Sequence, residues 1–108
     1  MFNNIKWIFF DIGSTLIDES KAYEHRIKDT VNELIFHIFN LALERANCNP
    51  QNSIMIGDRL DNDIVPAKSL GMHTIWIKQG FAKFTELRNE LEKPDYVIND
   101  LNDIFKYL

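Results

Sequence analysis

The sequence is poor in cysteine, proline and glycine, with 1, 3 and 4 of them among its 108 residues. The single cysteine, Cys48, excludes a disulfide within the chain and is typical of a reducing compartment, so we expect a cytoplasmic protein. No apolar run approaches the roughly 20 residues of a membrane span. The first residues lack the basic region, long apolar run and cleavage site of a signal peptide, so we expect no leader.

Positive charge is also scarce. Lysine and arginine number 12 against 16 for aspartate and glutamate, which gives a formal net charge of −4. This balance predicts no nucleic-acid partner and no anionic membrane surface as partner. An excess of acid is, however, compatible with binding a cation.

Apolar and aromatic residues are plentiful, at 45% and 12% of the chain. This content is too high for a disordered chain, and the sequence has no repeats, linkers or low-complexity tracts. We therefore expect one globular domain over residues 1–108.

Short apolar segments alternate with longer segments of helical spacing. Strands are predicted at Ile5–Phe10, Ser53–Ile56, His73–Ile77 and Tyr96–Ile98, and the first two read as strands buried on both faces. Helices are predicted at Ser20–Asn47, in a short stretch after Asp58, at Thr85–Lys93, and from an Asn99 or Asp100 cap to Leu108. The alternation predicts an α/β fold, a three-layer Rossmann-like parallel sheet with covering helices.

Two of these helices raise particular questions. The Ser20–Asn47 segment contains no glycine or proline, and its pattern fits one long helix or two that meet near Glu33. The short helix should hold Pro66 in its first turns and end at Gly71.

Acidic residues follow the first two predicted strands. Asp11 ends the first strand, Asp58 ends the second, and Asp61 and Asp63 come just after it. Sites in parallel α/β sheets lie at the carboxyl ends of the strands, where these carboxylates would converge. Converging carboxylates repel one another unless a cation lies between them, and oxygen ligands favour Mg²⁺.

The turns beside these acids suggest an anion site. Glycine at positions 13 and 57 lets the backbone approach a small anion closely, and Ser14 and Thr15 offer hydroxyl and N–H donors for phosphate.

Two segments resemble motifs of the haloacid dehalogenase (HAD) superfamily of phosphohydrolases. Trp7–Leu16, with the sequence WIFFDIGSTL, is similar to the first motif of that superfamily. Ile54–Ile64, with the sequence IMIGDRLDNDI, is similar to the fourth, and the stretch Pro66–Ile77 also reads like the family. The resemblance implies a HAD-like core over residues 5–20 and about 37–108.

The resemblance assigns roles to individual residues. Asp11 would be the nucleophile that forms an aspartyl-phosphate. Mg²⁺ would be bound by the carboxylates of Asp11 and Asp58 and by the carbonyl of Gly13. Asp63 would orient the site without binding the metal directly. The implied function is hydrolysis of a small phosphorylated substrate.

Three departures from the family pattern weigh against turnover. Gly13 stands where family phosphatases carry an aspartate as general acid and base, and glycine transfers no proton. The Ser/Thr of the second motif and the Lys of the third have no counterpart. The resemblance therefore implies an internally shortened relative without a cap, and the alternative function is an inactive remnant or binding module that retains the metal site.

The shortening would place the first strand at an edge of the sheet. An apolar edge over Lys6–Phe10 would pair readily with another strand. Either the Ser20–Asn47 helix covers this edge, or two copies form a homodimer through it.

Other interpretations of these residues remain open at this stage. Asp11, Ser14 and Thr15 could be ordinary turn residues, and Asp61 and Asp63 could be charges at a helix N-terminus. A response-regulator receiver shares the length, the parallel sheet and a phosphorylated aspartate, but it carries its acidic pair after the first strand.

Overall fold

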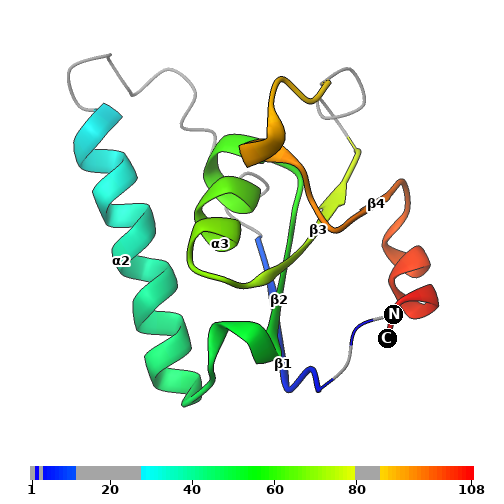
Figure 1. The fold of residues 1–108 in the computed structure, drawn as a ribbon, viewed down its shortest axis with the longest axis horizontal. Helices are drawn as coiled ribbons and strands as arrows, with labels where there is room; N and C mark the ends of the chain where they lie inside the picture. The colour runs from blue at the N-terminus through cyan, green and yellow to red at the C-terminus, as the bar shows by residue number, and fades with distance from the viewer. Residues whose placement is uncertain (1, 3, 12–27, 80–85) are drawn as a thin grey trace.

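The computed structural model describes residue 2 and residues 4–11, 28–79 and 86–108 (Figure 1). In chain order the elements are β1 (Trp7–Phe10), α2 (Lys28–Ala46), the 3₁₀ turn η2 (Pro50–Asn52), β2 (Ser53–Gly57), the π-helical turn η3 (Leu60–Ile64), α3 (Val65–Ser69), β3 (His73–Ile77), the 3₁₀ turn η5 (Glu90–Glu92), β4 (Tyr96–Ile98) and the 3₁₀ helix η6 (Leu101–Lys106).

The strands form one parallel sheet in the order β1-β2-β3-β4. Phe10 pairs with Ile56 in the register of β1 and β2, and Gly57 pairs with Trp76 in the register of β2 and β3. The carboxyl ends of β1 and β2 therefore lie side by side. The parallel sheet expected from the apolar segments is confirmed.

Each face of the sheet has its own apolar layer. Ile54, Ile56 and Ile75 pack with Ile104 of η6 on one face. On the other face, Met55 packs with residues of α2 and α3, namely Leu43 and Ala67. Figure 1 shows α2 and α3 on one side of the sheet and η6 beyond β4 on the other. The predicted three-layer α/β architecture is confirmed, with a 3₁₀ helix as part of one layer.

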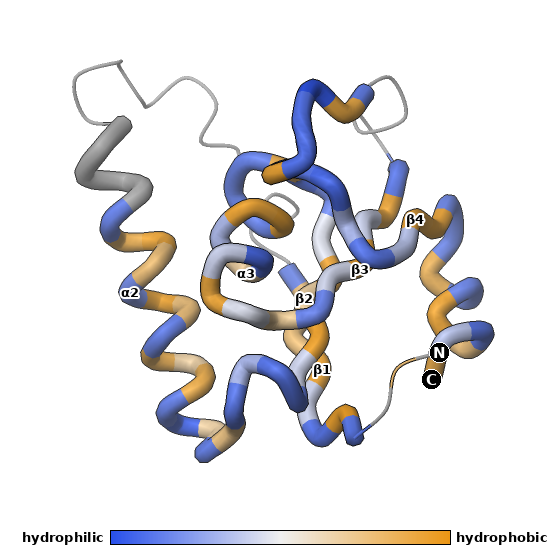
Figure 2. Tube along the Cα trace, in the orientation of Figure 1, coloured by the Kyte–Doolittle hydropathy of each residue, from blue (hydrophilic) through white to orange (hydrophobic). Residues whose placement is uncertain are grey.

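Helix α2 runs without a break past Glu33, so residues 28–46 form one helix and not two. Asn47 follows in the left-handed region at φ 50°, which ends the helix. Apolar residues recur along α2 in Figure 2. Leu43 is buried against the sheet, whereas Leu34 and Ile38 are exposed, because only one face of the helix packs on the core.

The helix after Asp58 begins as the π-helical turn η3 and continues as α3. Pro66 is the second residue of α3 and lies within the first turns of the combined helix that begins at Leu60. Gly71 follows the helix at φ +90°, a conformation that disfavours other residues. Both expectations for this helix are confirmed.

The predicted helix at Thr85–Lys93 is wrong over the described residues 86–93, which hold only the 3₁₀ turn Glu90–Glu92. Asn89 is extended at φ −162° and ψ 174°, which interrupts any helix there. Lys93 precedes Pro94, and a residue before proline disfavours the α conformation. The buried Glu92 accepts a hydrogen bond from Arg88 Nε at 2.8 Å in this conformation.

The last predicted helix exists, but as a 3₁₀ helix that ends at Lys106. Of the two predicted caps, Asp100 is the one used. Its side chain accepts a hydrogen bond from the backbone N–H of Asn102 at 2.8 Å.

Strand β1 departs from the prediction of burial on both faces. Trp7 and Phe10 are 48% and 50% exposed. Among the described residues the only strand beside it is β2, since β1 lies at the end of the strand order. The predicted apolar edge is therefore confirmed. Helix α2 packs on the face of the sheet, where Phe39 and Leu43 share a cluster with Phe9, and it leaves Trp7 and Phe10 half exposed.

Within the described part of the chain, no helix has both the length and the hydrophobicity to cross a membrane.

Candidate metal and phosphate site

The site is built at the carboxyl ends of β1 and β2. Asp11 directly follows β1, and its backbone N–H donates to the carbonyl of Ile56 at 3.0 Å. Asp58 directly follows β2. Because the two strands are parallel neighbours, both acids leave the sheet at the same edge. The sequence predicted this convergence.

The π-helical turn η3 brings a third carboxylate back to this edge. The N–H groups of Asp63 and Ile64 both donate to the carbonyl of Arg59, at 3.0 and 3.3 Å. The Asp63 Oδ2 atom then accepts the backbone N–H of Arg59 at 3.0 Å. π-Helical turns occur frequently at functional sites. Here the wide turn places Asp63, which is 4% exposed, beneath the other two acids.

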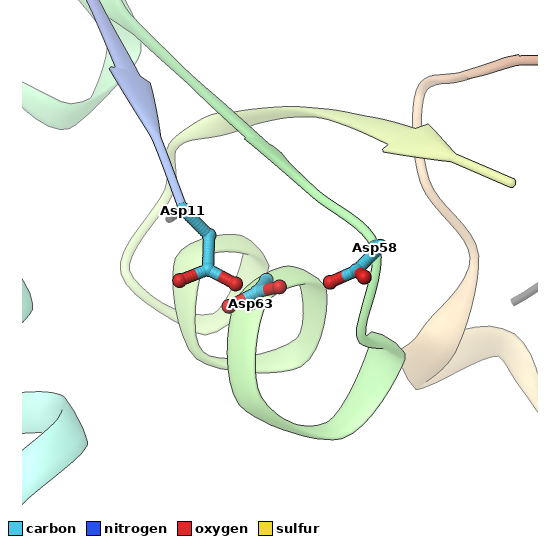
Figure 3. Close-up of side chains that lie close together, drawn as sticks. All are labelled: Asp11, Asp58 and Asp63. Carbon is cyan, nitrogen blue, oxygen red and sulfur yellow. The ribbon is translucent and has the colours of Figure 1, made fainter. Parts of the chain in front are cut away.

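The carboxylates of Asp11, Asp58 and Asp63 face one another in Figure 3. One oxygen from each lies within 4.8 Å of the others. We name these three residues the carboxylate cluster. Its oxygens are hard donors of the kind that divalent cations bind, so the donor set fits a metal ion.

Burial disfavours the charged form of Asp63, the one buried member of the cluster. The pKa of Asp63 is raised from 3.8 to about 8, first because burial desolvates the carboxylate. The neighbouring charge of Asp11, a hydrogen bond to the Asp11 side chain and the charge of Asp58 raise this pKa further, whereas the Arg59 N–H lowers it. A proton on Asp63 or a cation bound between the carboxylates would relieve the repulsion that Asp11 and Asp58 contribute.

Gly57 has a different role from the one predicted. A Cβ atom at this position would lie 2.3 Å from Asp63 Oδ2 and 2.6 Å from Asp63 Cγ. The space beside Gly57 therefore holds the carboxylate of Asp63, not an external anion. Glycine is required because any side chain would displace Asp63 from the cluster.

The remaining predicted residues divide into two groups. Gly13, Ser14 and Thr15 lie outside the described residues, so their metal and phosphate roles stay predictions. Asp61 is described but lies outside the carboxylate cluster, and its carboxylate forms an exposed ion pair with Arg59 at 3.1 Å. This contact agrees with the interpretation of Asp61 as a surface charge in the first turn of η3.

Trp76 also contacts the site, and it was not among the site residues predicted from the sequence. Trp76 donates its indole N–H to the backbone carbonyl of Asp58 at 2.9 Å. A buried tryptophan usually finds a hydrogen-bond partner for its N–H. A tryptophan inside the predicted strand His73–Ile77 therefore indicates a buried hydrogen bond from its indole N–H, but the sequence does not show which group accepts it.

Comparison with known proteins identifies the family. A model of the HAD-hydrolase-like family matches residues 36–104. A glyceraldehyde 3-phosphate phosphatase of Pyrococcus furiosus is 46% identical over 72 residues, which are 66% of this chain and 29% of that protein. Human glycerol-3-phosphate phosphatase is 26% identical over 92 residues, 77% of this chain and 29% of its own length.

Solved structures agree with the fold. A HAD phosphatase from Thermococcus onnurineus is 34% identical, with a TM-score of 0.52 over 65% of this chain and 30% of that one. A 2-haloacid dehalogenase from Pseudomonas syringae is 25% identical, with a TM-score of 0.58 over 66% of this chain and 29% of that one.

The chain spans less than a third of the length of these curated relatives, at 29% for both the archaeal and the human protein. The family model covers well over half of the residues, including Asp58 and Asp63, and it separates the chain from the receiver domains that share a similar sheet. The chain therefore belongs to the HAD-hydrolase-like family.

Proposed function

We propose that this chain hydrolyses small phosphate esters with Mg²⁺, with Asp11 as the nucleophile. The carboxylate cluster is the observation that carries the proposal, because it places three hard oxygen donors within 4.8 Å of one another at the carboxyl edge of a parallel sheet. The relatives include phosphatases named for glyceraldehyde 3-phosphate and glycerol-3-phosphate, which supports a small phosphorylated substrate.

Asp11 and Asp58 would hold the metal through their carboxylates, and the carbonyl of Gly13 would be a further ligand. Asp63 would orient this set through its contacts with Asp11 and with the N–H of Arg59. When bound, Mg²⁺ supplies positive charge that offsets the negative charge of the nucleophile and of the phosphate. The hydroxyl and N–H groups of Ser14 and Thr15 would bind phosphate oxygens.

The proposed reaction has two steps. A carboxylate oxygen of Asp11 attacks phosphorus, so that a bond from this oxygen to phosphorus forms while the ester P–O bond breaks. The leaving alkoxide takes a proton from water, because glycine at position 13 has no proton to give. A water molecule then attacks the aspartyl-phosphate, which releases phosphate and restores the Asp11 carboxylate. We expect slow turnover, since no side chain at position 13 speeds the proton transfers.

Gly13 favours a second candidate function. Without the general acid and base, the chain could retain the metal site as an inactive remnant or binding module. The two candidates differ in turnover and agree in metal binding, so measuring both separates them.

The decisive experiment measures phosphate release from an aryl phosphate, with Mg²⁺ and with chelator, for the unsubstituted chain, Asp11→Asn and Asp61→Asn. Asp61→Asn is the matched control, because Asp61 lies in the same turn as Asp63 but outside the cluster. We expect Mg²⁺-dependent release that Asp11→Asn abolishes and Asp61→Asn preserves.

Titration calorimetry with Mg²⁺ completes the test. Binding that Asp58→Asn weakens, without phosphate release above that of Asp11→Asn, would establish the binding module. Absence of Mg²⁺ binding by the folded chain would refute both candidates.

The composition of the chain and the exposed edge of β1 also support proposals for its partners, its location and its oligomeric state. A net charge of −4 argues against nucleic acid or an anionic membrane as partner, and the single cysteine suits the cytoplasm. The half-exposed apolar edge of β1 supports a homodimer in which two copies pair through this strand.

A further inference from the structure

Trp76 lies on the central strand β3, beside the strand that carries the site. It pairs with Gly57 of β2 on one side and with Val97 of β4 on the other, and it is 2% exposed. Its ring packs with Leu60 and Ile64, the first and last residues of η3. The same turn carries Asp63, so the tryptophan supports the turn from the sheet side.

The peptide unit between Asp58 and Arg59 links Trp76 to the carboxylate cluster through two hydrogen bonds. The carbonyl of Asp58 accepts the Trp76 indole N–H at 2.9 Å. The N–H of that same peptide unit belongs to Arg59 and donates to Asp63 Oδ2 at 3.0 Å. The peptide is trans and planar, so the direction of its carbonyl determines the direction of its N–H.

This arrangement is a chain of two hydrogen bonds through one peptide unit. Hydrogen bonds in series polarise one another, so a donor on the carbonyl strengthens the N–H as a donor. The ring is itself held in place, because the ammonium of Lys78 lies over it at 5.1 Å from the ring centroid. Trp76 and Asp63 therefore bind opposite sides of the peptide between Asp58 and Arg59, although Trp76 touches neither carboxylate in these contacts.

We propose that Trp76 is a positioning residue of the metal site, which sets the separation of the Asp58 and Asp63 carboxylates through the peptide between Asp58 and Arg59. The inference rests on the proposed function for its link to Mg²⁺. Its structural part, the control of the Arg59 N–H, does not depend on that function.

The test compares Trp76→Phe with Trp7→Phe. Trp76→Phe keeps an aromatic ring of smaller size and removes the indole N–H, whereas Trp7→Phe changes the other tryptophan, which is half exposed on β1. In Trp76→Phe we expect the Arg59 amide to exchange with solvent about tenfold faster, because freeing the Asp58 carbonyl lets this peptide turn and weakens the hydrogen bond from the Arg59 N–H to Asp63. We also expect Mg²⁺ binding to weaken about tenfold, as for a partner outside the ligand shell. Trp7→Phe should change neither.

A spectroscopic measurement covers the case in which Trp76→Phe does not fold. In Trp7→Phe the only indole N–H is that of Trp76, and its NMR signal should exchange slowly and shift when Mg²⁺ is added. An indole N–H that exchanges as fast as that of Trp7 in the unsubstituted chain would overturn the proposal.

The outcomes separate this inference from the proposed function. An unchanged Arg59 exchange rate in a folded Trp76→Phe chain overturns the inference, even if phosphate is released. Faster Arg59 exchange in a chain that binds no Mg²⁺ refutes the proposed function and supports the positioning role. Faster exchange together with weaker Mg²⁺ binding supports both.

Discussion

Strands β1 and β2 are neighbours with similarly apolar sequences, yet their surroundings differ. Ile54 of β2 is fully buried, while Phe10 of β1 is 50% exposed. The reason is position, because β2 has a strand on each side and packed residues on both faces, whereas β1 has one strand neighbour in the described part of the chain. An apolar run therefore shows that a strand can be buried, and the number of neighbours decides whether it is.

The carboxyl ends of the two strands differ as well. β2 ends in Gly57, whose missing side chain leaves the space that the Asp63 carboxylate fills. β1 leads into Asp11, which is tied to β2 through its bond to the carbonyl of Ile56. The segment that follows β2 thus supplies Asp58 and Asp63, and the residue after the edge strand β1 is the proposed nucleophile.

Truncating one apolar side chain in each strand to alanine should give the largest difference in the free energy of unfolding. Ile54→Ala leaves a cavity in the core and should lower the free energy of unfolding by about 2–5 kcal/mol. Phe10→Ala removes a larger but half-exposed side chain and should cost less than about 1.5 kcal/mol, since less apolar surface returns to water. Urea denaturation of both variants measures the difference. Equal losses would show that β1 is as buried as β2, contrary to the structure.

The buried Asp63, whose carboxylate lies beside the end of β2, should make the free energy of unfolding depend on pH. The folded pKa of Asp63, about 8, lies above its ordinary value of 3.8. Between these values the folded chain keeps a proton that the unfolded chain releases, so the free energy of unfolding falls as pH rises. The stabilisation is fully present below the ordinary pKa and lost above the folded one. The slope approaches about 1.4 kcal/mol per pH unit inside this window.

Urea denaturation at pH 5 and pH 7 in chelator measures this slope. Asp63→Asn is the control, because its amide oxygen can still accept the Arg59 N–H but does not titrate. The variant should be less sensitive to pH than the unsubstituted chain. Parallel pH profiles for the two chains would contradict the raised pKa.

A charged substitution on the edge strand β1 should change the stability least of all and should clearly change the oligomeric state. Trp7→Lys places a charge on the edge strand, which discourages pairing with a second copy. We expect the unsubstituted chain to form dimers with increasing concentration and Trp7→Lys to remain monomeric, with stability altered by about 1 kcal/mol or less. Light scattering after size exclusion measures the mass. Phe105→Lys is the control, since Phe105 is an exposed aromatic residue on η6. A monomeric unsubstituted chain at every concentration would exclude this dimer.

Local patterns predicted most of the fold because they report local preferences. Apolar segments located the strands, and Gly71 was correctly predicted to end the short helix. The prediction failed at Thr85–Lys93, where helical spacing was present but the burial of Glu92 and the restriction before Pro94 favoured a 3₁₀ turn. The helical spacing reveals neither effect, although Pro94 itself is visible in the sequence.

The candidate site was predictable to a similar extent. Asp11, Asp58 and Asp63 were all named from the sequence, because acids after parallel strands meet at one edge. The roles of Gly57 and Trp76 were not predictable in this form. Each depends on a contact across the fold, with Asp63 in one case and the Asp58 carbonyl in the other.

The sequence by itself determined the parallel α/β sheet, the positions of its acids and the resemblance to HAD phosphohydrolases, since these follow from spacing and residue type along the chain. Only the tertiary structure decided that Asp63 is buried with a raised pKa, that Gly57 accommodates its carboxylate, and that β1 is half exposed. These properties depend on which atoms surround a residue in space, and segments far apart in the sequence supply those atoms.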